Sequence, residues 1–265
     1  MTRLGVCGWP VAHSRSPQMH NAALAVLGLD WRYQRLPLPP ELFAETVRAL
    51  PAAGFRGVNV TIPHKQAALA LADSASESAR AIGAVNTLTF ETDGSIHADN
   101  TDATGFLAAL GRSAYGRTAL VLGAGGSARA VVYALRQAGA AEVRIWNRTP
   151  ERAAAVAAEL GAVAVRAAEP ADILVNCTSI GLQNPDETFK ALPLRADELT
   201  AGRLVVDMVY RLGGTVLLQA AKAGGADVVD GLEVLVAQGA ASLERWTGRT
   251  APDQAMREAV RDIAT

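Results

Sequence analysis

The sequence predicts an α/β protein built from two open α/β domains, and three observations lead to this fold class. Short apolar runs alternate with segments of helical periodicity, which is the pattern of β-α-β units with mostly parallel strands. A glycine turn at 123–128 stands between one such run and a helix, near the middle of the chain. The 265 residues exceed one typical domain, so two hydrophobic cores are expected.

Composition excludes several classes of protein. Half of the residues (50%) are hydrophobic and the formal net charge is −1, which argues against disorder, a nucleic-acid footprint and a membrane-binding face. We recognise no signal peptide and no uncharged apolar run long enough to span a bilayer, so a cytoplasmic protein is expected. Cys7 and Cys177 lie in apolar strand patterns without metal-ligand spacing. Buried reduced thiols are therefore expected, and no metal site.

A polar turn at 8–17 follows the first expected strand, at 4–7. Turns at the carboxyl ends of strands are where open α/β sheets bind ligands. The hydroxyls of Ser14 and Ser16 are thus candidates to bind a polyhydroxy or carboxylate ligand, and the alternative is that they serve only the turn and a helix cap. We expect Ser16 to cap a helix that has Pro17 at its first position. Structural hydrogen bonds are the expected role of the nearby His13 and His20.

The N-terminal sheet continues with strands expected at 31–36 and 57–60, separated by a helix at 41–50. The second of these strands runs into Pro63, where another helix is expected to begin. Lys65 then lies in the first helical turn, where the helix dipole disfavours a cation. Lys65 therefore needs an anionic partner.

Asp102 is the candidate partner of Lys65. It follows a hairpin with strands at 88–90 and 95–98. Thr101 is expected to cap the next helix, with Asp102 in its first turn, where a carboxylate is favourable. Asp102 is either only a capping carboxylate or the partner of Lys65, and the pairing is favoured because both residues follow strands that border one expected crevice. Such a pair could shuttle a proton, since the titrations of its two members would couple.

The centre of the chain is a strand at 119–122, the turn at 123–128 and a helix. Gly123 allows the tight turn, and Gly125 lets backbone N–H groups approach a pyrophosphate. Small side chains at Ser127 and Ala128 let the helix pack on its strand, and its N-terminus favours phosphates. This context predicts a Rossmann-type dinucleotide-binding domain, the alternative being an ordinary strand-to-helix turn.

The residues that follow the next strand, expected at 143–146, indicate which dinucleotide is bound. Folds that prefer NAD usually place a carboxylate about 20 residues after the glycine turn, to bind the ribose 2′-hydroxyl. Here the strand ends in Asn147, Arg148 and Thr149, with Arg152 one helical turn later. Two guanidiniums suit a 2′-phosphate, so NADP is preferred over NAD. The alternative is two solvated arginines, although cations are disfavoured at the helix N-terminus where these stand.

Three more strands are expected at 172–177, 204–209 and 227–229. The first two carry polar tips, at 176–181 and 207–210, which should flank the nicotinamide. The helices expected in this part of the chain lie at 150–160 (capped by Thr149), 215–223, 231–246 and 252–263. Gln238 stands among apolar neighbours and is either an internally satisfied amide or a ligand contact.

The expected domains are a substrate-binding domain at 1–102, completed by returning helices at 238–265, and an NADP-binding domain at 103–237. The active site is expected in the cleft between them.

Taken in order, the motifs resemble those of the shikimate dehydrogenase family along essentially the whole chain. The matching segments are 8–21, 59–65, 82–87, 100–105, 123–128, 147–149, 176–181 and 231–238. The resemblance implies reversible NADPH-dependent reduction of 3-dehydroshikimate to shikimate, a step towards aromatic amino acids. The chain departs from the family pattern at 211–214, where many relatives have proline, and at Glu233 and Val234, where a small residue and Met are common.

The same resemblance implies roles for individual residues. The catalytic pair falls on Lys65 and Asp102. The substrate contacts fall on Ser14, Ser16, Asn59, Thr61, Asn86, Tyr210 and Gln238. The cofactor contacts fall on Gly123, Ala124, Gly125, Gly126, Ser127, Asn147, Arg148, Thr149 and Arg152, and also on Glu77, Met208 and Gly231.

Two rival functions stay open. One is a quinate/shikimate dehydrogenase that uses NAD or both cofactors, since the arginines do not exclude dual use. The other is a non-catalytic sensor of NADP or shikimate, which would predict a lost catalytic pair, whereas Lys65 and Asp102 are both present. The sequence leaves a monomer and a homodimer equally open, and no feature indicates a nucleic-acid or membrane partner.

The cofactor argument leads to a first prediction. Replacing Arg148 by Ala should raise the Michaelis constant for NADP much more than that for NAD, because only NADP carries the phosphate that the guanidinium is expected to bind. Steady-state kinetics with both cofactors measure this. Equal effects on the two constants would mean that Arg148 does not bind the 2′-phosphate.

Overall fold

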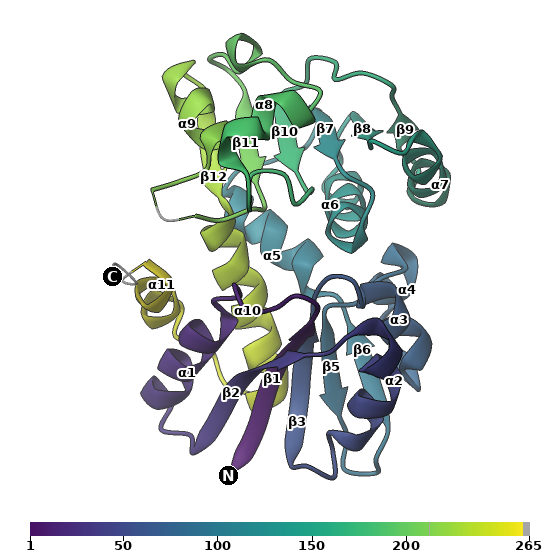
Figure 1. The fold of residues 1–265 in the computed structure, drawn as a ribbon, viewed down its shortest axis with the longest axis vertical. Coiled ribbons are helices and arrows are strands. Elements are labelled where there is room, and N and C mark those ends of the chain that lie inside the picture. Colours follow the sequence, from purple (N-terminus) through teal and green to yellow (C-terminus); the bar gives the residue numbers. More distant parts are fainter. Residues whose placement is uncertain (212, 262–265) are drawn as a thin grey trace. The chain divides into compact units, whose positions relative to one another are not determined.

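The structure is a computed structural model, which describes residues 1–211 and 213–261. The chain divides into two compact units, each with its own six-stranded sheet (Figure 1). The first unit comprises Met1–Gly105 and Leu235–Thr265, and the second comprises Phe106–Val234. The chain passes from one unit to the other inside two helices, α5 (Thr101–Leu110) and α10 (Gly231–Thr247). The functional domain boundaries given above, 1–102 with 238–265 and 103–237, stay a prediction.

The sheet of the first unit is mixed. Its strand order is β2-β1-β3-β5-β6-β4, in which β1 pairs with β2 and β3 in parallel and β4 pairs with β6 in parallel. The antiparallel pairs are β3 with β5 and β5 with β6, the latter being the expected hairpin. The strands are β1 (Thr2–Gly8), β2 (Trp31–Pro37), β3 (Phe55–Val60), β4 (Ser74–Ala75), β5 (Thr87–Phe90) and β6 (Ile96–Asp99).

Helices cover this sheet. They are α1 (Ser16–Val26), α2 (Pro40–Ala49), α3 (Lys65–Leu71), α4 (Glu77–Ile82) and α11 (Asp253–Arg261), together with parts of α5 and α10. A buried cluster that includes Phe43, Val58 and Leu88 forms the core under α2 and α3. Helix α11 packs on α1, and Arg15 Nη1 donates to the carbonyl of Val260 at 2.7 Å. The helix expected at 252–263 thus begins at Asp253, and its last two expected residues lie outside the described part of the chain.

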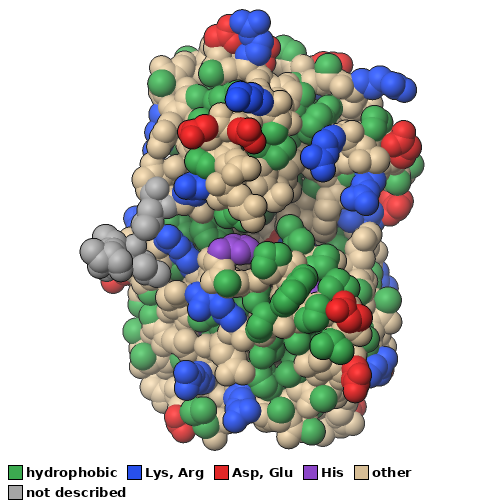
Figure 2. Space-filling view, viewed as in Figure 1, with side chains coloured by type: hydrophobic (Ala, Val, Ile, Leu, Met, Phe, Trp, Pro, Cys, Tyr) green, Lys and Arg blue, Asp and Glu red, His purple; other side chains and the backbone are tan. Residues whose placement is uncertain are grey.

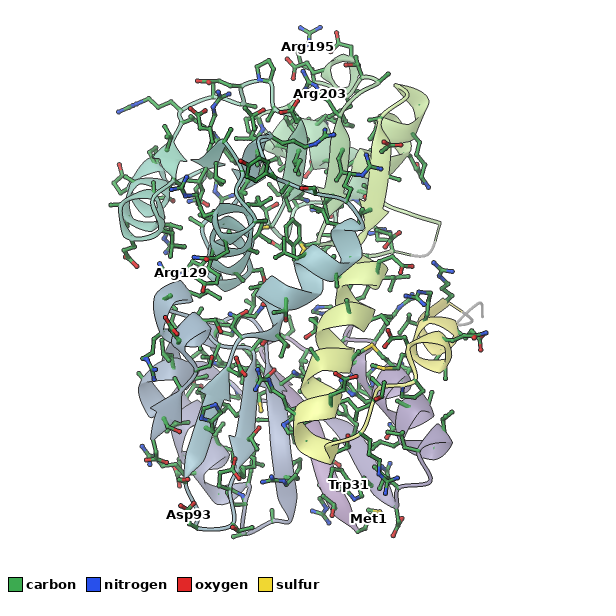
Figure 3. The ribbon with its side chains drawn as sticks, turned by 180° about the vertical axis from the view of Figure 1, so that it is seen from behind. Met1, Trp31, Asp93, Arg129, Arg195 and Arg203 are labelled. Carbon is green, nitrogen blue, oxygen red and sulfur yellow. The ribbon has the colours of Figure 1, made fainter. Side chains whose placement is uncertain are left out.

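Helix α10 lies against the first sheet, as Figure 3 shows from behind. Trp246 Nε1 donates to the carbonyl of Leu88 at 3.1 Å. A Cβ at Gly57 would lie 2.1 Å from that indole nitrogen, so only glycine allows this approach. The contact fixes the helix that carries Gln238.

Several helix starts differ from expectation. Ser16 does not cap α1, because the helix already begins at Ser16 and its N-cap residue, Arg15, makes no side-chain cap bond. Helix α3 begins at Lys65 and not at Pro63, since His64 N donates to Thr61 O at 2.9 Å and closes a turn first. Lys65 still lies in the first turn, as expected.

At α5, Asn100 takes the place expected for Thr101. Asn100 Oδ1 accepts a hydrogen bond from Ala103 N at 3.2 Å, which is the cap bond, whereas the Thr101 hydroxyl bonds to Asn86. Asp102 lies in the first turn, as expected. Thr149 does stand at the N-cap of α7 (Pro150–Leu160), but its side chain makes no cap bond.

The sheet of the second unit is entirely parallel, with strand order β12-β11-β10-β7-β8-β9. Counted along the chain, this is order 3-2-1-4-5-6 of the Rossmann fold, which reverses between β7 and β10. The strands are β7 (Thr118–Leu122), β8 (Glu142–Trp146), β9 (Val163–Ala164), β10 (Ile173–Asn176), β11 (Leu204–Asp207) and β12 (Asp227–Asp230). The predicted fold class, two α/β domains of which one is Rossmann-type, is confirmed.

The second unit is completed by α6 (Gly126–Gln137), α7, α8 (Thr188–Ala191), α9 (Val216–Ala223) and two 3-10 turns, η1 (Pro185–Glu187) and η2 (Ala196–Glu198). Helix α6 buries Val131, Val132 and Leu135, the apolar face that the sequence indicated. No helix within residues 1–211 and 213–261 is long and apolar enough to cross a membrane. Charges of both signs are scattered over the face seen in Figure 2.

Among the described residues neither cysteine forms a disulfide bond. Cys7 is buried in β1, and burial raises the pKa of its thiol to about 12. Cys177 is only half-buried, because β10 ends one residue earlier, at Asn176. The expectation of a buried strand cysteine is therefore right for Cys7 and wrong for Cys177.

Candidate functional site

Lys65 and Asp102 form a buried ion pair in the first unit. Lys65 Nζ donates to Asp102 Oδ2, and the two residues are only 8% and 6% exposed. The other carboxylate oxygen, Oδ1, accepts a hydrogen bond from Asn86 Nδ2 at 2.8 Å. Lys65 thus has the anionic partner that its place at a helix start requires, and both oxygens of that partner are occupied.

Backbone hydrogen bonds bring the two residues together. Lys65 follows β3 and Asp102 follows β6, while Asn86 immediately precedes β5, which lies between those strands. Val85 N donates to the carbonyl of Lys65 at 2.9 Å, and Asn86 N donates to that of Asp99 at 3.1 Å. The segment before β5 therefore joins the ends of both neighbouring strands.

Asn86 is the centre of a larger polar network. Its Oδ1 accepts from Thr101 N at 2.7 Å, and its Nδ2 also donates to Gln238 Oε1 at 3.1 Å. A Cβ at Gly105 would lie 2.5 Å from Gln238 N, so this glycine lets α10 bring Gln238 close to α5. Gln238 Nε2 donates to Leu235 O at 2.8 Å. Gln238 is half-buried, so its amide is bonded internally and still partly accessible.

Asn59 lies deeper and is committed to protein groups. It is 5% exposed, its Oδ1 accepts from the hydroxyl of Tyr33 at 2.8 Å, and its Nδ2 donates to Ser242 Oγ at 3.1 Å. Neither Tyr33 nor Ser242 is among the residues predicted from the sequence. Ser242 stands four residues after Gln238 on the same helix face, a spacing that could have identified it. Nothing in the alternation of β2 distinguishes Tyr33 from a core aromatic residue.

Ser14 and Ser16 lie together in the same unit, 7% and 5% exposed, and Ser14 Oγ donates to Ser16 Oγ at 3.2 Å. Arg35 holds their loop through two donors, Nε and Nη2, which reach the carbonyl of Ser14 at 3.0 and 2.6 Å. Thr61 borders the polar turn as well, since a Cβ at Gly8 would lie 2.4 Å from Thr61 Cγ2. The structure thus places two hydroxyls beside a guanidinium, an arrangement suited to an anionic group.

The glycine turn of the second unit has the geometry that a dinucleotide site needs. Gly123 has φ 109°, and a Cβ there would lie 3.1 Å from the carbonyl carbon and oxygen of Cys177. Gly125 is exposed, and a Cβ there would meet nothing within 4 Å. Helix α6 starts at Gly126, so its first N–H groups belong to Gly126, Ser127 and their neighbours.

The strand beside this turn, β8, ends at Trp146, and the predicted phosphate-binding residues follow it. Asn147 Nδ2 donates to the carbonyl of Thr149 at 2.9 Å and shapes the loop. Arg148 and Arg152 are exposed, and within the described residues neither forms an ion pair. Both guanidiniums are therefore available to an anion.

The tips of β10 and β11 form a second polar cluster. Asn176 and Asp207 are 0% and 1% exposed, and Asn176 Nδ2 donates to Asp207 Oδ1 at 2.9 Å. Met208 N donates to Asn176 O at 2.9 Å. A Cβ at Gly231 would lie 2.7 to 2.8 Å from the carbonyl oxygens of residues 207–209, so glycine is required there.

The remaining candidates are more scattered. Tyr210 is half-buried and belongs to the second unit, whereas the other substrate candidates belong to the first. Glu77, a cofactor candidate, is exposed at the start of α4 in the first unit. Of the departure at 211–214, Leu212 lies outside the described residues.

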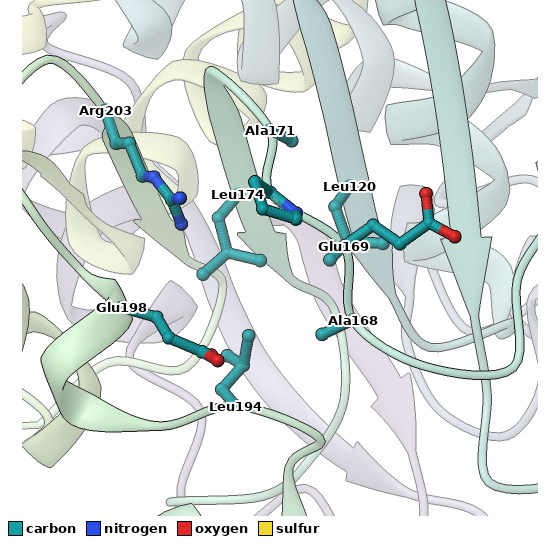
Figure 4. Close-up of a pocket in the computed structure, with 9 residues that line it drawn as sticks. Leu120, Ala168, Glu169, Ala171, Leu174, Leu194, Glu198 and Arg203 are labelled. Carbon is teal, nitrogen blue, oxygen red and sulfur yellow. The ribbon is translucent and has the colours of Figure 1, made fainter.

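One pocket of the second unit contains none of these residues (Figure 4). Its lining includes Ala168, Pro170 and Ala171, which precede β10, and Arg203, which precedes β11. It therefore lies at the amino ends of the strands, whereas open α/β sheets bind ligands at the carboxyl ends. No group of three or more potential metal ligands occurs among residues 1–211 and 213–261.

His20 differs from expectation. It is fully buried, its ring stacks on Tyr33 with centroids 4.2 Å apart, and neither ring nitrogen has a hydrogen-bond partner. The expected structural hydrogen bond is therefore absent. Burial disfavours the charged ring and lowers the pKa of His20 from 6.5 to about 3, and the nearby Asn59 side chain opposes this shift.

Comparisons with known proteins match the whole chain to one family. Three family models match: "Shikimate dehydrogenase substrate binding domain" over residues 6–88, "Shikimate / quinate 5-dehydrogenase" over 108–180 and "Shikimate 5'-dehydrogenase C-terminal domain" over 231–261. A curated relative from Paracoccus denitrificans, named shikimate dehydrogenase (NADP(+)), is 46% identical over 97% of this chain and 94% of its own.

Solved structures are also similar to nearly the whole chain. The shikimate 5-dehydrogenase of Thermus thermophilus, in complex with NADP(H) and shikimate, has a TM-score of 0.89 and 46% identity over 98% of this chain and 99% of its own. The ligand-free 5-ketofructose reductase of a Gluconobacter strain has a TM-score of 0.87 and 36% identity over 99% of this chain and 98% of its own.

The burial of His20 leads to a prediction about stability. As pH falls below 6.5, the unfolded chain takes up a proton at this position and the folded protein does not, so stability is lost as pH falls towards 3. Between pH 7.5 and 5.5 this loss is about 1 kcal/mol. In a His20→Leu variant that part of the loss should disappear, as urea unfolding at the two pH values would measure. His97→Leu, which removes a half-buried histidine of the same unit, is the matched control. An identical pH dependence of wild type and His20→Leu would contradict the assignment.

Proposed function

The chain belongs to the shikimate dehydrogenase family, and we propose that it catalyses the reversible NADPH-dependent reduction of 3-dehydroshikimate to shikimate, a step in aromatic amino acid biosynthesis. The observation that carries this proposal is the buried Lys65–Asp102 pair. A buried lysine and carboxylate in contact, with the carboxylate held by a hydrogen bond from Asn86, are suited to acid–base catalysis on a hydroxyl group.

In the proposed reaction Lys65 holds and moves the proton at the reacting oxygen. During oxidation of shikimate the hydroxyl proton passes to the Lys65–Asp102 pair as the carbinol C–H bond breaks and the carbonyl forms. Bound NADP would supply the hydride acceptor for this oxidation, and bound NADPH the hydride donor for the reduction. Asp102 polarises Lys65, and Asn86 fixes the orientation of Asp102 through its bond to Oδ1.

We assign the cofactor to residues whose geometry in the second unit fits it. Gly123, Ala124, Gly125, Gly126 and Ser127 would hold the pyrophosphate at the start of α6, where Gly125 leaves open space. Arg148 and Arg152 would bind the 2′-phosphate, supported by the loop residues Asn147 and Thr149. Met208 and Gly231 would lie at the nicotinamide. Glu77 is assigned to the cofactor on family resemblance alone.

The substrate is assigned to the polar surface around the ion pair. Ser14 and Ser16 would bind its anionic end beside Arg35. Its hydroxyl groups would be bound by Thr61, Asn86 and Gln238. Asn59 would act mainly by holding Asn86, to whose carbonyl its Nδ2 donates at 3.1 Å. Tyr210 completes the set.

A second candidate function is favoured by the relative named 5-ketofructose reductase, which is similar over nearly the whole chain. That name describes reduction of a different polyhydroxy ketone. Reduction of such ketones, or of the quinate counterpart, would use the same ion pair.

A cytoplasmic location is also proposed. A monomer and a homodimer both stay open as the oligomeric state.

The proposed specificity is tested by initial rates with shikimate or quinate against NADP or NAD. We expect shikimate with NADP to be well ahead, because Arg148 and Arg152 are exposed and, within residues 1–211 and 213–261, neither is in an ion pair. Faster rates with quinate or with NAD would overturn the proposed specificity, but the ion pair would keep its catalytic role. Absence of activity in all four combinations would favour a sensor.

The catalytic role is tested by Lys65→Ala. Turnover should fall by about 10²–10⁴, the usual contribution of a positioned proton-transfer group, while NADP still binds. The exposed Lys222→Ala, which removes a lysine from α9, is the matched control and should keep full turnover. Undiminished turnover of Lys65→Ala would remove Lys65 from the mechanism.

A further inference from the structure

Asp207 joins two loops of the second unit through a single buried carboxylate. It is the last residue of β11 and is 1% exposed. Its Oδ1 accepts from Asn176 Nδ2 at 2.9 Å and from Val209 N at 3.0 Å, and its Oδ2 accepts from Thr215 Oγ1 at 2.7 Å. Three donors from three places in the chain therefore converge on one side chain.

Each of these donors holds a loop in turn. Asn176 Oδ1 accepts from the hydroxyl of Thr178 at 2.7 Å, and that hydroxyl accepts from Ile180 N at 3.1 Å. Thr215 caps α9, because its hydroxyl accepts from Leu218 N at 3.3 Å. The loop after β10 and the loop between β11 and α9 are thus fixed to each other at Asp207.

The strand order shows which half of a dinucleotide these loops would meet. In a doubly wound sheet the cofactor crosses the point where the order reverses, here between β7 and β10, with one nucleotide on each side. Arg148 and Arg152 follow β8, so the nucleotide with the 2′-phosphate lies on that side. The nicotinamide nucleotide is left for the side of β10 and β11, which ends in the loops fixed at Asp207.

We propose that Asp207 is the positioning residue of the nicotinamide half of the cofactor site, acting through the loops that it joins. The inference rests on the proposed function, because it requires that the chain binds NADP. Asp207 itself touches no reacting atom in this proposal. Its removal should weaken the hold on the nicotinamide nucleotide and leave the 2′-phosphate end unaffected.

The charge of Asp207 adds a pH signature. Burial raises the pKa of Asp207 to about 6, its three hydrogen bonds oppose this shift, and the carboxylate of Asp230 on β12 adds to it. As pH falls through 6, Asp207 gains a proton and its bonds lose their charge assistance. The hold on the nicotinamide nucleotide should therefore weaken below pH 6. The 2′-phosphate titrates near the same pH, so the reference for the pH series must titrate at this group alone, as adenosine 2′-monophosphate does.

The test compares Asp207→Asn with wild type by calorimetric titration at pH 7.5, using NADP⁺ and adenosine 2′,5′-bisphosphate, which lacks the nicotinamide nucleotide. We expect about tenfold weaker binding of NADP⁺, as for loss of one good hydrogen bond to a charged group, and bisphosphate binding within about twofold of wild type. If Asp207→Asn lost affinity for both ligands equally, or for neither, the positioning role would be overturned and the proposed function would stand. Wild-type protein that binds neither ligand would overturn the proposed function as well.

A second pair of variants keeps the test independent of the folding of Asp207→Asn. Thr215→Val removes the donor to Asp207, whereas Thr215→Ser keeps it, so NADP⁺ affinity should fall in the first and return in the second. Equal affinities in the two would contradict the proposal.

Between pH 8 and 5, the affinity ratio of NADP⁺ to adenosine 2′-monophosphate should fall below pH 6 in wild type and stay flat in Asp207→Asn. In Asp230→Asn, which removes the neighbouring charge, this fall should move to lower pH. A ratio independent of pH in wild type would overturn the role of the charge.

Discussion

A buried ion pair imposes conditions on everything around it, and in this protein the conditions set by Lys65 and Asp102 explain much of the first unit. Two charges removed from water are stable together only if their remaining hydrogen-bonding capacity is satisfied, and loss of one partner typically costs about 3–5 kcal/mol. Asn86 meets this need for Asp102, and Asn59, Thr101 and Gln238 hold Asn86 in turn. The polar network is thus a requirement of the pair.

The fold could be predicted from the sequence because its signals are local. The glycine turn, the β-α-β alternation and the hairpin each lie within a short stretch, and each is present in the structure. The Lys65–Asp102 contact could also be anticipated, because the sequence shows a cation at a helix start and a carboxylate after another strand of the same sheet. The family assignment rested on the same motifs and is confirmed by comparison.

What the sequence could not provide depends on contacts between distant residues. Tyr33 and Asn59 are 26 positions apart, and Asn59 and Ser242 are 183 apart, so no spacing rule identifies their bonds. The helix cap at α5 failed for a related reason, because the hydroxyl of Thr101 bonds to Asn86, which is 15 positions away. The cap at α1 failed because the helix already begins at Ser16, which leaves Arg15 at the N-cap. Asp207 looked like one polar tip among several, and only the convergence of three donors sets it apart.

The two cysteines differ in a way that has a practical consequence. A thiol with a pKa near 12 is almost never a thiolate at neutral pH, so Cys7 should be inert to alkylating reagents in the native protein. Cys177 is partly accessible, and its carbonyl group lies against the glycine turn at Gly123. Of the two cysteines, Cys177 is thus the one to test as an attachment point for a fluorophore, and its backbone contacts the turn that the cofactor would occupy. Dinucleotide binding could be followed there in real time without any engineered residue.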